Sequence, residues 1–87
     1  MKIKEGFVLK EIDNNFIVVA IGEAVKTFNG MIQLNETSAF LWKLLESGKE
    51  EREMAEEFAK EYGVSLEIAT NDVNEFIQNL KEANLLK

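Results

Sequence analysis

The sequence contains no cysteine, no histidine and no proline. Without cysteine the chain has neither a disulfide framework nor a thiolate nucleophile, and without histidine it lacks the usual metal ligand and the usual general base of enzymes. The absence of proline leaves no rigid break that would divide the 87 residues into two units. The composition therefore predicts a single small domain, residues 1–87, that has no cofactor and is not an enzyme.

Long apolar runs are also missing. The longest is FIVVAI at residues 16–21, which is far shorter than the ~20 residues that cross a bilayer. The N-terminal MKIKEGF has two lysines but no apolar segment behind them, so it does not resemble a secretory signal. We therefore expect no membrane association and a cytoplasmic location.

Basic residues are few. Ten lysines and arginines stand against sixteen acidic residues, which gives a net charge of −6. A protein that neutralises phosphates needs the opposite sign, so nucleic acid is disfavoured as a partner. Seven glutamates gather between Glu46 and Glu61. They are typical of a solvated helix face, with a docking surface for a basic partner as the alternative.

The first part of the chain predicts strands. Residues 7–12 and 16–21 are rich in apolar β-formers, and Asp13-Asn14-Asn15 between them suits a hairpin turn. Because 16–21 is apolar at every position, we expect a central strand covered on both faces. After an irregular stretch and an Asn29-Gly30 turn, 31–34 (MIQL) alternates as a third strand. This gives a meander of order 1-2-3, in which VKTF at 25–28 is an alternative start of the last strand.

From Asn35 onward the apolar spacing becomes helical. Asn35 suits a helix N-cap, Gly48 a helix end, Gly63 a left-handed C-terminal cap and Ser65 the start of a third helix. Asn84 is a tolerable left-handed residue before the closing leucines. The sequence therefore predicts an α+β, winged-helix-like domain with a three-stranded antiparallel β-meander followed by a three-helix bundle.

In such a meander the third strand is an edge. Its sequence has neither the proline nor the lysine that commonly blunts edge strands. One interpretation is that an extended peptide pairs with this edge through backbone hydrogen bonds. The simpler alternative is a short bare edge with no ligand, as in many small sheets.

Three segments together resemble the PqqD family, whose members are also called RiPP recognition elements. They are LNETSAFLWKLL at 34–45, EEFAKEYGVS at 56–65 and DVNEFIQNLKEANLL at 72–86. Two features depart from the family pattern: Asn84 stands where glycine is frequent, and the segment before the third strand is longer than usual. The order and spacing of the three segments carry the resemblance.

The resemblance implies a non-catalytic peptide chaperone. Such a protein binds the leader segment of a ribosomally synthesised precursor peptide by β-strand addition to the third strand, beside the last helix. It presents the peptide to a modifying enzyme such as a radical SAM protein or a peptidase. The positions that would contact the peptide are Met31, Ile32, Gln33, Leu34, Lys26, Ile68, Asn71, Asp72, Glu75 and Asn79.

Two other functions remain open at this point. A winged-helix-like regulator would bind DNA or another protein, but residues 66–83 carry Lys81 against four acidic side chains, which argues against a DNA reader. A non-catalytic subunit of a permanent complex is the other possibility, because helices cover only one face of a three-stranded sheet. The oligomeric state is expected to be a monomer or a weak homodimer.

Overall fold

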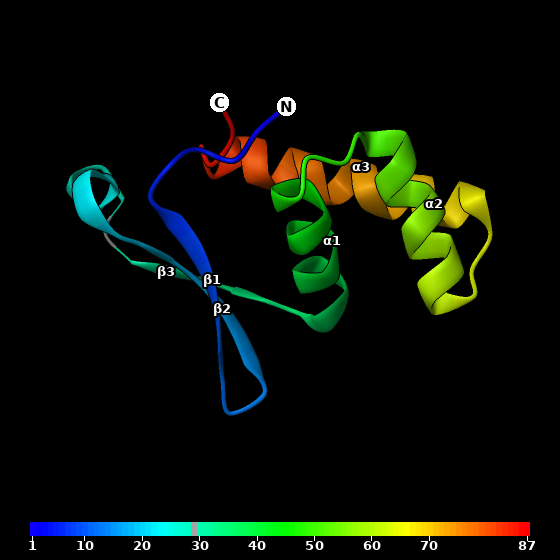
Figure 1. The fold of residues 1–87 in the computed structure, drawn as a ribbon, viewed down its shortest axis with the longest axis horizontal. Coiled ribbons are helices and arrows are strands. Elements are labelled where there is room, and N and C mark those ends of the chain that lie inside the picture. The colour runs from blue at the N-terminus through cyan, green and yellow to red at the C-terminus, as the bar shows by residue number, and fades with distance from the viewer. Residues whose placement is uncertain (29) are drawn as a thin grey trace.

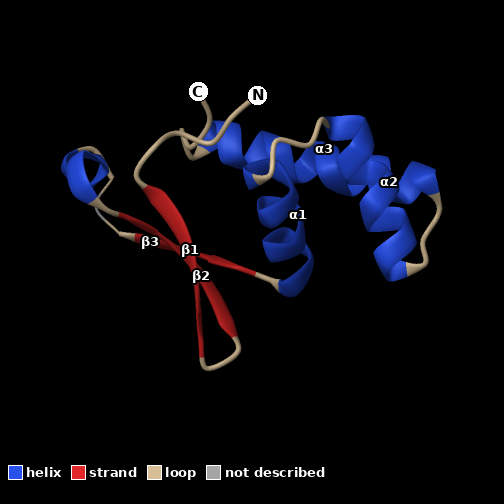
Figure 2. Cartoon of the chain, in the orientation of Figure 1, coloured by secondary structure: helices blue, strands red, loops and turns tan. Residues whose placement is uncertain are grey.

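The computed structural model describes residues 1–28 and 30–87. Three strands come first and three helices follow, which confirms the predicted α+β fold (Figures 1 and 2). A short 3₁₀ helix, η1, precedes the last strand. The elements are β1 (Phe7–Ile12), β2 (Asn15–Ala20), η1 (Gly22–Lys26), β3 (Met31–Leu34), α1 (Glu36–Glu46), α2 (Glu51–Tyr62) and α3 (Leu66–Glu82).

The hairpin between β1 and β2 turns more tightly than predicted. Asp13 and Asn14 have φ angles of 51° and 67°, and Asn15 already pairs with Ile12 as the first residue of β2. Two successive residues of positive φ make a turn whose twist matches that of the strands, and aspartate and asparagine tolerate this conformation. The predicted three-residue turn is therefore a two-residue turn, and β2 runs over 15–20 instead of 16–21.

The sheet has the predicted order β1-β2-β3, and both pairings are antiparallel. Val18 of β2 is completely buried, whereas Ile17 and Val19 on the opposite face are half-buried. The expectation that β2 is covered on both faces is therefore wrong within this chain.

Residues 21–28, between β2 and β3, are not part of the sheet. Val25 and Lys26 belong to η1, so the alternative in which VKTF extends the last strand is wrong. The rings of Phe28 and Phe7 form a T-shaped pair with centroids 5.4 Å apart. The segment that links β2 to β3 therefore packs against the core at Phe28. The expected Asn-Gly turn includes Asn29, which lies outside the described residues.

The predicted helix boundaries are confirmed at their caps. The Asn35 side chain accepts a hydrogen bond from the backbone N–H of Ser38, and the Ser65 hydroxyl accepts one from that of Ile68. Gly63 has a φ of 64° directly after α2, and Asn84 one of 61° after α3. The hydrogen bonds to Asn35 and Ser65 satisfy backbone N–H groups that every helix start leaves without an intrahelical partner.

The core lies between the sheet and the three helices. Its largest fully buried side chains are Trp42, Met54, Leu85, Val18 and Val73. The two termini lie side by side, as Figure 1 shows, because the backbone N–H of Lys4 donates to the Leu85 carbonyl at 2.8 Å. Within the described residues, no helix is long and apolar enough to span a membrane.

Candidate functional site

The outer edge of β3 is open. β3 pairs with β2 on one side only. Along residues 30–34 the structure shows no backbone hydrogen bond to any described element outside the sheet. In an antiparallel strand, alternate residues direct their N–H and C=O groups away from the neighbouring strand. β3 therefore offers a short row of backbone donors and acceptors on its free side.

A cavity of about 210 Å³ lies beside this edge, between β3 and α3. Six of its ten lining residues are apolar, and they come from the strand, the last helix and the segment after it. The lining residues are Ile32, Gln33, Leu34, Asn35, Ser38, Phe76, Asn79, Leu80, Ala83 and Leu85. An extended chain that paired with β3 would place alternate side chains in this cavity.

A second cavity of about 170 Å³ continues from the first toward the start of α3. The two share Asn35, Ser38, Phe76 and Asn79, so we call them together the β3–α3 groove. The other residues that line the second cavity are Thr37, Leu41, Phe58, Asp72 and Glu75. The groove thus has an apolar end beside β3 and a polar, acidic end between the first turn of α1 and the middle of α3.

The structure places three of the four predicted β3 residues on the groove. Ile32 and Leu34 are half-buried and line it on the core-facing side of the sheet. Gln33 also lines the groove, and its amide donates a hydrogen bond to the Asn15 side chain at 3.3 Å. Met31 is 66% exposed and lines neither cavity. Its backbone belongs to the open edge, whereas its side chain lies outside the groove.

Some of the predicted positions on α3 line the groove and others do not. Asp72, Glu75 and Asn79 line the groove. Ile68 and Asn71 are exposed and line neither cavity, although Ile68 stands one helical turn before Asp72 on the same stripe.

Lys26 does not line the groove. It lies on η1, where its ammonium group is 3.1 Å from the carboxylate of Glu23. Both side chains are largely exposed, so this pair contributes little to stability.

Several groove residues were not among the predicted contacts. Phe76 and Leu80 are buried in the core, and both also line the groove. Ala83 and Leu85 complete the apolar end. The signal in the sequence was the i, i+3, i+4, i+7 spacing from Asp72, which places residues 75, 76 and 79 on one stripe.

The acidic end of the groove has no basic counterpart. Asp72 and Glu75 take part in none of the ion pairs or side-chain hydrogen bonds found among the described residues. No lysine or arginine lines either cavity. Across residues 1–28 and 30–87 no three metal-binding side chains gather closely enough to hold an ion. The groove therefore supplies shape, backbone groups and negative charge.

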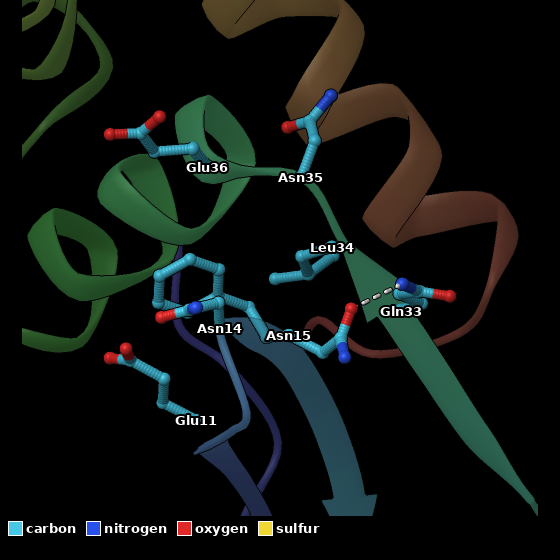
Figure 3. A pocket seen from close by; sticks show the side chains of 8 residues that line it. Glu11, Asn14, Asn15, Gln33, Leu34, Asn35 and Glu36 are labelled. Atoms are coloured by element: carbon cyan, nitrogen blue, oxygen red, sulfur yellow. Dashed lines mark hydrogen bonds between the residues drawn. The ribbon is translucent and has the colours of Figure 1, made fainter.

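A larger cavity, of about 460 Å³, lies on the other side of β3, next to the β1–β2 hairpin. Figure 3 shows Asn14, Asn15 and Leu34 around it, with the Gln33–Asn15 hydrogen bond at its rim, whereas the Asn35 side chain points toward α3. Amides and two carboxylates line it, with Phe16 and Leu34 as its apolar residues. It is more polar than the apolar end of the groove.

Nearly the whole chain matches a known protein family. The family described as coenzyme PQQ synthesis protein D (PqqD) matches residues 7–86, which is nearly the whole chain. The chain belongs to the PqqD family. The resemblance seen in the sequence is thereby confirmed, and the matched region contains both the edge strand and α3 of this PqqD-family domain.

Two solved structures share the fold of this PqqD-family domain. "TbiB1 in Complex with the TbiA(beta) Leader Peptide" is 26% identical, with a TM-score of 0.84, and the match covers 100% of this chain and 95% of that one. "Lasso peptide synthetase B1 complexed with the leader peptide" is 21% identical, with a TM-score of 0.81 over 99% and 95% of the two chains. At that identity the second structure shows the fold alone. Comparison with curated protein sequences finds no match.

Proposed function

We propose that the chain is a non-catalytic domain that binds the leader segment of a ribosomally synthesised precursor peptide. The peptide adds as a fourth strand to the free edge of β3 and places alternate side chains in the β3–α3 groove. The observation that carries the proposal is the coincidence of an open edge and an adjoining cavity on one side of β3. Backbone groups provide affinity in this mode of binding, and the pockets beside them provide selectivity.

The comparisons support the same function. Family membership brings the expectation of peptide binding, and TbiB1, which is 26% identical, forms a complex with a leader peptide. TbiB1 is similar over the whole length of this chain, so β3 and α3 both have counterparts in a protein that binds such a peptide. DNA binding has no comparable support, because the groove side of α3 is acidic.

The partner that acts on the peptide is a separate modifying enzyme, such as a radical SAM protein or a peptidase. The domain holds the leader in extended form and leaves the remainder of the precursor free for that enzyme. The described side chains offer a binding groove with no gathered metal ligands, which suits this division of labour.

The test is a backbone-methylation scan of a bound peptide. A peptide that binds the chain is selected from a library of random sequences, and variants with a single N-methyl group at each position are then titrated. Strand addition predicts that methylation weakens binding at every second position, because only alternate N–H groups face β3. A bound peptide without this alternation, or a failure to select any peptide, would contradict the proposal.

A further inference from the structure

The two ends of the β3–α3 groove differ in chemistry, and this difference restricts the peptide that fits. Beside β3 the lining is mainly apolar, with Ile32, Leu34, Phe76 and Leu80 contributing side chains. Asp72 and Glu75 precede Leu80 on α3 by one to two helical turns, and they line the continuation of the same groove. A strand lying along β3 therefore meets apolar surface at one end and negative charge at the other.

The two carboxylates are not neutralised by the chain itself. Asp72 and Glu75 are three residues apart on a helix, so they are neighbours on its surface, where like charges repel weakly. Both are exposed, and neither forms an ion pair with any described basic residue. The side chains of Asn35, Thr37 and Ser38 that face them carry no charge. A basic side chain placed here would meet two carboxylates that no described lysine or arginine pairs with.

The neighbouring surface suits a long basic side chain. Ile68 is 51% exposed and stands one turn before Asp72, so its apolar surface adjoins the acidic end of the groove. Lysine and arginine bury their aliphatic stems along such surface while the charged head stays in water. Phe58 and Phe76 supply further apolar contact within the same cavity.

We infer that this domain selects peptides that combine an apolar side chain with a lysine or arginine on the same face of the strand. The apolar side chain fills the end lined by Ile32, Leu34 and Leu80, and the basic side chain reaches Asp72 and Glu75. Because strand side chains alternate, the two residues are separated by an even number of positions. The inference rests on the proposed function, since the open edge of β3 is what positions the strand.

The test starts from peptides selected from a random library for binding to the intact chain. The inference predicts that they are enriched in a basic and an apolar residue at even spacing. Each exposed ion pair contributes little, so Asp72→Asn or Glu75→Gln is expected to raise the Kd of such a peptide roughly two- to fivefold. The effect should shrink as salt is added, because exposed charges are screened.

The matched controls are the single variants Glu57→Gln and Glu67→Gln, each of which removes one charge from an exposed position that lines neither cavity. Each is expected to leave the Kd nearly unchanged. A charge exchange strengthens the test further. Glu75→Lys should weaken binding of the basic peptide and favour its counterpart in which the basic residue is replaced by glutamate.

The outcomes separate this inference from the proposed function. Selected peptides that shift the β3 amide signals but lack a basic residue, or whose Kd is the same for Asp72→Asn and the wild type, would overturn the inference and leave strand addition intact. If no selected peptide shifts the β3 amide signals, the proposed function fails, and the inference fails with it. Enrichment of basic peptides together with the charge exchange would support both.

Discussion

The Asn35 side chain accepts a hydrogen bond from the backbone N–H of Ser38 at 2.8 Å, directly after the last residue of β3. The same oxygen accepts a second hydrogen bond from the Thr37 hydroxyl at 3.0 Å. One residue thus ends the edge strand, caps α1 and lines both cavities of the groove. The strand and the helix that follows it are held in fixed relation at the point where a peptide would pass.

Replacing Asn35 tests this junction. Asn35→Ala removes the cap and is expected to lower the free energy of unfolding by about 1 kcal/mol. Asn35→Asp keeps an acceptor at the same place and should remain close to the wild type. Urea denaturation followed by circular dichroism measures both. Equal losses in the two variants would show that the cap is not the source of the stability.

Gly6 and Gly48 share a positive φ but differ in their surroundings. Their φ angles are 91° and 88°, so an added side chain costs about 1–2 kcal/mol at either position through backbone strain. A Cβ at Gly6 would also lie 2.7 Å from that of Ala24, whereas one at Gly48 would meet nothing within 4 Å. We expect Gly6→Ala to be the more destabilising in urea denaturation. Equal effects would mean that η1 moves aside without cost.

Trp42 is fully buried, and its indole N–H has no hydrogen-bond partner among the described residues. Trp42→Ala leaves a large cavity and is expected to cost about 3–5 kcal/mol of unfolding free energy. Trp42→Phe should cost much less, because removing an unpaired donor offsets part of the lost packing. Chemical denaturation compares the two variants. If the phenylalanine variant were as unstable as the alanine variant, the indole N–H would have to form a hydrogen bond that the described part of the structure does not contain.

Burial raises the pKa of Tyr62 above its ordinary value of 10.0, and the charges of Glu36 and Glu61 add to the effect. The folded state therefore disfavours the phenolate more than the unfolded state does. Stability is unaffected by this group below pH 10 and falls as pH rises from the unfolded toward the folded pKa. Because Tyr62 is the sole tyrosine, its ultraviolet absorbance reports the titration directly. Tyr62→Phe should lose this part of the alkaline destabilisation, and an unchanged pH profile would contradict the assignment.

The sequence predicted those parts of the fold that depend on local patterns. The third strand over 31–34 and the caps at Asn35, Gly63 and Ser65 follow from alternation and from residue types with strong preferences, and all are confirmed. η1 was missed because five residues are too few for a helical period to show. Glu50 is the N-cap residue of α2, and its backbone N–H donates a hydrogen bond to the carboxylate of Glu53 at 3.1 Å. Glutamate is an uncommon N-cap residue.

The groove was harder to predict than the elements that form it. Phe76 and Leu80 pack into the core and line the groove at once, and a helical pattern assigns such residues to the core alone. Met31 was among the predicted peptide contacts on the edge, yet strand alternation turns its side chain to the face opposite Ile32. The case of Phe76 and Leu80 depends on how α3 packs against β3, which is a tertiary relation that helical spacing alone does not give, whereas the direction of the Met31 side chain follows from strand alternation.

Strand addition at β3 is the central claim, and backbone hydrogen exchange tests it most directly. The chain carries its own control, because β1 forms the opposite edge of the same sheet. With a selected peptide bound, the account predicts slower exchange at outward-facing amides within 31–34 and no change at the outer edge of 7–12. Protection at β1, or protection that spares β3 while the peptide is bound, would contradict it.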